Sequence, residues 1–138
     1  TWNLVIGDKK FDNTKLFDWR ENDQTKYESR KGKYSAVFRL KPAKAKQYFI
    51  DLGKVYYTAK VKINGTDAGK MIYAPYQLNI TKYLKKGENT VEVEITTSRR
   101  NGFVGEAANG NKQYLQFRFK EKTIVPSGLV GPVRIIEK

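Results

Sequence analysis

Apolar and polar residues alternate along most of this chain, which is the pattern of β-strands that bury one face. Four segments show the alternation most clearly, and their predicted inward-facing residues are Tyr34, Ala36, Phe38 and Leu40; Tyr48, Ile50 and Leu52; Val55, Tyr57, Ala59, Val61 and Ile63; and Val91, Val93 and Ile95. Further strands are expected at residues 2–6, 113–119 and 132–136. The period of two predicts a protein built from β-sheets.

Turn residues separate these segments at short intervals. Asn64-Gly65 is the preferred two-residue hairpin turn, because a type I′ turn needs positive φ at both positions. Other turns are expected at Gly53, Gly69, Pro75 and Lys86-Gly87, and one helical turn near residues 81–84, with Thr81 as its N-cap. Together they predict an all-β jelly-roll β-sandwich of about eight antiparallel strands, with residues 1–138 as a single domain. The less regular residues 8–32 and 98–111 are candidate functional loops.

Composition removes most kinds of active site. The 138 residues include no Cys and no His, so thiolate nucleophiles, disulfides, imidazole bases and the common zinc ligand sets are excluded. No apolar run approaches the ~20 residues that span a bilayer, and the start lacks the features of a signal peptide. We expect a soluble domain cut from a longer protein.

The net charge of +13 is concentrated in the middle of the chain. Between Ser29 and Lys86 there are 14 Lys or Arg residues, and the only acids are Asp51 and Asp67. This surplus predicts attraction to polyanions such as acidic glycans or nucleic acid. The alternative is charge that only keeps solvated strand faces soluble. Outward-facing Lys60 and Lys62 would then pair with the outward-facing glutamates of residues 91–95 if the two strands are neighbours.

Beyond the alternation of apolar and polar residues, the chain contains several short sequence motifs in a fixed order. These motifs are IDLGKV at 50–55, AKVKING at 59–65, Pro75-Tyr76, NITKYLKKGENTVEVEI at 79–95, NGFVGE at 101–106 and SGLVGPVR at 127–134. The series resembles the galactose-binding-like β-sandwich, the sugar-binding type of accessory domain in glycoside hydrolases of family 2 and in α-L-rhamnosidases of family 106. The loop after Ile95 departs from the family pattern, and Asn79 stands where the family has Asp.

The resemblance implies a non-catalytic carbohydrate-binding-type domain of a secreted, extracellular or periplasmic glycoside hydrolase. Its implied partners are carbohydrate and the catalytic domain of the same polypeptide. Glycoside hydrolysis needs two carboxyl groups about 5–10 Å apart, and nothing in the sequence places the two least explained acids, Asp51 and Glu106, together. The charge adds the expectation of an acidic, uronate-containing plant-type polysaccharide. We expect no cofactor; galactose-binding-like sandwiches often carry structural calcium, but no dense Asp/Asn cluster supports it here.

Sugar binding needs exposed aromatic rings and planar polar side chains on loops or on an open sheet face. The candidate ligand-binding residues are Tyr73, Arg99, Arg100, Asn101, Phe103, Glu106, Tyr56 and Trp19. Burial competes with each assignment: a tryptophan in the position of Trp19 more often covers the end of the sandwich, and Tyr76 is expected to pack inward. Two further hypotheses stay open, namely a docking module without glycan affinity and, less favoured, a basic nucleic-acid-binding β-barrel.

Overall fold

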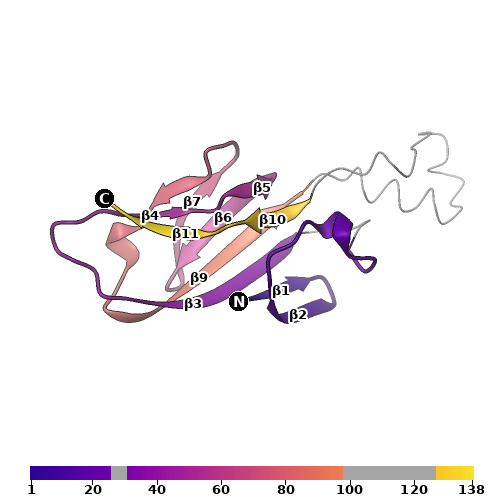
Figure 1. Cartoon of the computed structure of the whole chain (residues 1–138), viewed down its shortest axis with the longest axis horizontal. Coiled ribbons are helices and arrows are strands. Elements are labelled where there is room, and N and C mark those ends of the chain that lie inside the picture. Colours follow the sequence, from indigo (N-terminus) through magenta and orange to yellow (C-terminus); the bar gives the residue numbers. More distant parts are fainter. Residues whose placement is uncertain (26–30, 98–126) are drawn as a thin grey trace, which may run out of the picture.

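The computed structural model describes residues 1–25, 31–97 and 127–138. These residues form a β-sandwich with two short 3-10 helices (Figure 1). The elements are β1 (Trp2–Ile6), β2 (Lys9–Thr14), η1 (Trp19–Glu21), β3 (Gly32–Leu40), β4 (Tyr48–Asp51), β5 (Lys54–Tyr56), β6 (Thr58–Ile63), β7 (Thr66–Met71), β8 (Gln77–Asn79), η2 (Thr81–Tyr83), β9 (Gly87–Thr96), β10 (Gly128–Gly131) and β11 (Arg134–Glu137). None of the helices in the described ranges is long and apolar enough to cross a membrane.

One layer is a six-stranded sheet with the order β2-β1-β3-β9-β6-β7. The other layer consists of a three-stranded sheet, β11-β4-β8, and the pair β10-β5. Neighbouring strands run antiparallel in both layers. The predicted all-β sandwich is confirmed, but it has more strands than the eight or so that were expected, and several of them are short. One extra strand arises because the predicted segment 55–63 changes sheets and forms both β5 and β6, and the others, β2, β7, β8 and β10, lie outside the segments that alternation identified.

The core lies between the two layers and contains nearly all of the predicted inward-facing residues. Leu4, Ile6, Ile50, Val61 and Ile95 are among those with no appreciable exposure. Tyr57 is the exception, since 39% of its surface is exposed. The chain leaves β5 in the smaller layer at Tyr56 and enters β6 in the six-stranded sheet at Thr58. The prediction that Tyr57 faces inward was therefore wrong, because it assumed one strand across this change of sheet.

Most of the predicted turns are present, but the turn expected at Gly69 was wrong, because Gly69 lies inside β7 at an irregularity in its pairing with β6. Asn64 and Gly65 have φ values of 51° and 82°, as the type I′ turn requires. The helical turn at 81–84 is confirmed as η2, but Thr81 does not cap it. Instead, the Asn79 side chain accepts a hydrogen bond from the Thr81 backbone N–H (3.0 Å), and the Thr81 hydroxyl accepts one from the Tyr48 N–H (2.8 Å). Asn79 thus replaces the Asp of the family pattern without losing the turn.

The remaining strand predictions met different outcomes. The strand at residues 2–6 is confirmed, and β11 begins two residues later than predicted, at Arg134. Strand β2 was expected to be part of an irregular loop; its residues KKFDNT are mostly polar and none is fully buried, so periodicity could not identify it. The expected strand at 113–119 and the candidate loop at 98–111 lie outside the described residues.

Candidate functional site

One end of the sandwich carries a group of exposed aromatic and apolar side chains. The exposed residues are Tyr57, between β5 and β6, and Ile72 and Tyr73, between β7 and β8; together with the half-buried Tyr56, the last residue of β5, we call them the tyrosine rim. Tyr73 is 74% exposed and Ile72 is 59% exposed. Such large apolar surfaces on a folded domain mark candidate binding regions when they are grouped.

Strand pairing brings the two links of the rim to the same end. Ala59, two residues after Tyr57, pairs with Met71, two residues before Tyr73. The Tyr76 hydroxyl also donates a hydrogen bond to the Tyr57 carbonyl oxygen at 2.6 Å. Strand β9 ends beside this region, since the Tyr57 N–H donates to the Thr96 carbonyl at 3.0 Å. The rim is therefore one region assembled from three segments of the chain.

Two rings of the rim, those of Tyr56 and Tyr57, are positioned by contacts with their neighbours. Tyr56 and Tyr57 meet edge to face, with ring centroids 5.6 Å apart and planes at 82°, a favourable arrangement for aromatic pairs. Tyr76 lies beneath them and is buried, which confirms that it packs inward. Burial raises the pKa of the Tyr76 phenol, and the neighbouring Tyr56 and Tyr57 phenols raise it further. Tyr76 is thus a neutral support for the exposed rings.

A charged pair adjoins the rim on the side of Tyr56. Arg20 contacts Asp18 through two nitrogens, with Nε–Oδ2 at 2.9 Å and Nη2–Oδ2 at 2.8 Å. The Asp18 hydrogen bond raises the pKa of Arg20, and Tyr56 contributes to the same effect. Asp18 also accepts from the Ser127 N–H at 3.2 Å, immediately before the Gly128–Tyr56 pairing of β10 and β5. Arg20 is a polar group beside the rim that the sequence patterns did not identify.

Trp19, one of the candidate ligand-binding residues, is completely buried. Its indole N–H donates to the Tyr34 hydroxyl at 2.8 Å, and its backbone N–H donates to the Ser127 carbonyl at 3.0 Å. A buried ring offers no face to a sugar, so the candidate role of Trp19 in binding was wrong. Trp19 instead covers the end of the core, the alternative that the sequence also allowed.

The structure therefore divides the candidate residues into three groups. Tyr56 and Tyr73 lie on the rim, where Tyr57 and Ile72, which were not candidates, join them. Trp19 belongs to the core. The other candidates fall outside the described residues, and these are Arg99, Arg100, Asn101, Phe103 and Glu106. The sequence did contain a signal for Tyr57. Two adjacent tyrosines, Tyr56 and Tyr57, interrupt the regular alternation at the point where the chain changes sheets.

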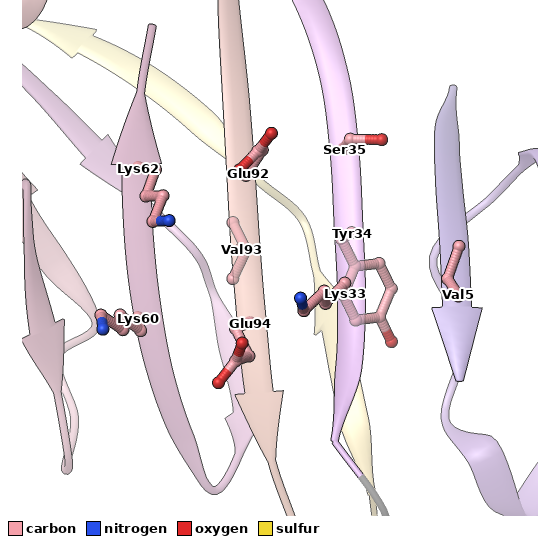
Figure 2. Close-up of a pocket in the computed structure, with 9 residues that line it drawn as sticks. All are labelled: Val5, Lys33, Tyr34, Ser35, Lys60, Lys62, Glu92, Val93 and Glu94. Carbon is pink, nitrogen blue, oxygen red and sulfur yellow. The ribbon is translucent and has the colours of Figure 1, made fainter. Parts of the chain in front are cut away.

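A second surface, a groove of about 350 Å³, crosses the solvent face of the six-stranded sheet (Figure 2). Its polar lining consists mainly of Lys33 from β3, Lys60 and Lys62 from β6, and Glu92 and Glu94 from β9. The predicted neighbourhood of the two strands is confirmed, because Lys60 is opposite Glu94 and Lys62 is opposite Glu92.

The ion pairs on this face do not join the residues that lie opposite each other on β6 and β9. Lys60 lies 3.8 Å from Asp67, and Glu94 lies 3.5 Å from Lys31. All four side chains are substantially exposed, so each pair contributes at most about 1 kcal/mol. The prediction that Lys60 and Lys62 form ion pairs with Glu92 and Glu94 was therefore wrong, because Lys60 and Glu94 have other partners. The mixture of positive and negative side chains on this face still accounts for part of the lysine content.

Asp51, one of the two acids that the sequence left unexplained, has a structural role. Its carboxylate accepts hydrogen bonds from the Gly53 N–H (2.9 Å), the Gln77 amide (3.2 Å) and the Arg134 guanidinium (3.1 Å). The Gly53 N–H is the main cause that lowers the pKa of Asp51, and Arg134 and Gln77 add to it against the opposing effect of burial. Asp51 is thus an ionised anchor that joins β4, β8 and β11. Within the described part of the chain, no group of three or more acidic residues is arranged to hold a metal ion.

Comparisons with known proteins agree with this architecture. A family model described as "Glycosyl hydrolase 2 galactose-binding domain-like" matches residues 7–125. A putative beta-glucuronidase of Formosa agariphila is 32% identical over 96% of this chain and 14% of the relative. The rhamnosidase from Novosphingobium sp. PP1Y superimposes with a TM-score of 0.85 at 29% identity, over 99% of this chain and 14% of the rhamnosidase.

A third similar protein shares the fold at lower identity. It is the FMN-binding beta-glucuronidase from Facaelibacterium prausnitzii L2-6, with a TM-score of 0.70 and 19% identity, over 99% of this chain and 21% of that enzyme. The chain thus spans about a seventh of the length of the curated relative and of the rhamnosidase.

Proposed function

Because the chain belongs to the galactose-binding-like domains of glycosyl hydrolase family 2, we propose that it is the non-catalytic accessory domain of a larger glycoside hydrolase and binds carbohydrate at the tyrosine rim. The observation that carries the proposal is the pair of exposed rings, Tyr57 and Tyr73, on two links that the β6–β7 pairing holds at one end. Aromatic rings provide flat apolar faces that stack on the C–H surfaces of sugars.

The parent enzyme, in this proposal, degrades a polysaccharide that contains acidic sugars. Two observations support this substrate class: the charge of +13, and a relative that is named as a putative beta-glucuronidase. A basic domain raises the local concentration of an anionic polymer near the catalytic domain. An enzyme that acts on polymers too large to enter a cell works outside the cytoplasm, so we place the parent protein in the extracellular or periplasmic space.

A docking role is the second candidate, and the exposure of Ile72 favours it. An aliphatic side chain that is 59% exposed next to Tyr73 suits a protein contact better than a polar sugar. In this alternative the rim packs against the catalytic domain of the same polypeptide and has no affinity for glycans. The two roles differ in whether a free saccharide stabilises the isolated chain.

The test compares ring removal with ring retention at Tyr73. Neutral and uronate-containing oligosaccharides are titrated into the chain and its Tyr73→Ala and Tyr73→Phe variants, with melting temperature and calorimetry as readouts. Stacking predicts that Tyr73→Ala loses about tenfold in affinity, while Tyr73→Phe retains it. If no saccharide shifts the melting temperature of the original chain, carbohydrate binding at the rim is rejected in favour of docking.

A further inference from the structure

The end of the sandwich opposite the tyrosine rim is strongly basic. It is formed by residues 39–46, which include the end of β3 and most of the β3–β4 loop, and by residues 82–88, which run from η2 to the start of β9; we call it the basic end (Figure 1). The two segments hold seven Lys or Arg residues, and their only acid is Glu88, so their net charge is +6. Nearly half of the surplus charge of the chain therefore lies in one place.

Strand pairing forces two of these lysines together. Leu40 at the end of β3 pairs with Gly87 at the start of β9, so the next residues outward, Lys41 and Lys86, emerge side by side. They line a shallow groove of about 290 Å³ together with Arg39, Leu40 and Gly87. Like charges at opposed positions destabilise a strand pair. An anion bound between them would relieve this repulsion.

The basic end is held in place by hydrogen bonds on both of its segments. In the β3–β4 loop, the Ala43 N–H donates to the Tyr48 hydroxyl at 2.9 Å, and Gln47 exchanges two backbone hydrogen bonds with Lys138. In the other segment, the buried Asn89 side chain accepts from the Lys85 N–H and donates to the Lys85 carbonyl, both at 2.9 Å. The lysines thus project from an ordered backbone, so the positions of their Cα atoms are set before a ligand binds.

Few of the acids in the described ranges lie near this surface. Glu88 lies 4.0 Å from Arg39, with both side chains mostly exposed, and that contact is weak. Glu137 lies nearby on β11, where it is paired with Tyr48. Lys82 lies over the ring of Tyr83, 5.2 Å from its centroid. Lys41, Lys44, Lys46, Lys85 and Lys86 are exposed and have no ion pair with the described acids.

From this arrangement we propose that the basic end binds a linear polysaccharide that carries carboxylate or sulfate groups, at a site separate from the tyrosine rim. The inference rests on the proposed role of the domain in carbohydrate binding, and it adds a second contact with the polymer. Ammonium groups on several segments match anionic groups that repeat along a chain. The rim would contact sugar rings, whereas the basic end would recognise charge.

Nucleic acid is a poorer fit to this end. Binding of single strands relies on exposed aromatic rings on which bases stack. At the basic end, Tyr48 is buried and Tyr83 is half-buried beneath Lys82. Exposed rings in the described ranges instead lie on the rim, at the other end of the sandwich.

The test uses four lysine-to-glutamine substitutions at the basic end and four elsewhere. The test variant changes Lys41, Lys44, Lys85 and Lys86, and the control variant changes the exposed Lys10, Lys15, Lys33 and Lys70, so both variants have the same net charge. Affinity is measured for polygalacturonate, dextran sulfate, neutral dextran and single- and double-stranded DNA, at low salt and at about 0.15 M salt, where charges are screened beyond ~8 Å.

We expect the test variant to lose about tenfold in affinity for one or both anionic polysaccharides and the control variant to lose about threefold or less. If the test variant loses more affinity for polygalacturonate, carboxylate is the preferred group; if it loses more for dextran sulfate, sulfate is the preferred group. Equal losses in the two variants, no binding of either polymer by the original chain, or tighter binding of DNA would each overturn the proposal. The proposed rim function fails separately, because a Tyr73→Ala variant that binds neutral oligosaccharides as tightly as the original chain contradicts a role of the rim but leaves the basic end intact.

Discussion

The buried indole N–H of Trp19 donates a hydrogen bond to the hydroxyl oxygen of Tyr34 at 2.8 Å, on the inner face of the six-stranded sheet. The same hydroxyl accepts from the Leu129 backbone N–H of β10 at 3.1 Å. One oxygen atom therefore links the N-terminal segment, the central strand β3 and the opposite layer. This link closes the sandwich directly below the region where Tyr56 pairs with β10.

Removing the Tyr34 hydroxyl is expected to destabilise the fold. Tyr34→Phe leaves the Trp19 and Leu129 N–H groups buried without an acceptor, which costs about 2–3 kcal/mol of unfolding free energy. Urea unfolding followed by tryptophan fluorescence measures this cost. Tyr73→Phe is the control, because Tyr73 is exposed and its hydroxyl is accessible to water in both states; its change should stay within about 0.5 kcal/mol. Equal effects at the two positions would contradict the role of the buried hydroxyl.

Tyr34 also makes stability depend on alkaline pH. Burial is the main cause that raises its pKa from 10.0 to about 12. A pKa that is higher in the folded state means that the stabilisation is complete below about pH 10 and is lost as the pH rises towards about 12. The loss amounts to about 2–3 kcal/mol for a shift of this size. The stability advantage of the original chain over Tyr34→Phe should shrink over that range, and a constant difference would contradict the buried neutral phenol.

Asp51 is expected to contribute stability at neutral pH that is lost in acid. Its pKa is lowered in the folded state, so the stabilisation is present above the unfolded value of about 4 and disappears as the pH falls through the folded value. Asp51→Asn keeps an acceptor for the Gly53 N–H but loses the charge that holds Arg134. The variant should be about 1 kcal/mol less stable near pH 7 and show a shallower acid transition.

Asp67 provides a matched control for this prediction. Its carboxylate also accepts from a glycine N–H two residues on, at 3.0 Å from Gly69, but the residue is exposed on the β6–β7 hairpin. Asp67→Asn should change the free energy of unfolding by about 0.5 kcal/mol or less, because water replaces what the exposed carboxylate loses. A larger effect at Asp67 than at Asp51 would show that burial is not what makes Asp51 important.

The sequence predicted those features that depend on local patterns. Alternation identified the buried faces of β3, β4, β6 and β9, and the Asn64-Gly65 pair identified the turn between β6 and β7. Alternation says nothing about which sheet a strand enters, so the prediction failed at Tyr57, where the chain crosses between layers. It also could not separate a buried tryptophan from an exposed one at Trp19. The basic end likewise required the β3–β9 register, because its two segments are about forty residues apart in sequence.

Gly128 is predicted to be the glycine of the Trp19 contact that tolerates substitution least. Its φ is +92°, and a Cβ there would lie 2.4 Å from the Trp19 indole nitrogen, an atom held by its bond to Tyr34. Gly128→Ala should cost about 3 kcal/mol or more, the sum of backbone strain and a core clash. Gly87 has a similar φ of +96° with nothing within 4 Å, so Gly87→Ala should cost only about 1 kcal/mol of strain. Urea unfolding of both variants compares the two costs; equal losses would mean that the Trp19 contact contributes nothing beyond backbone strain.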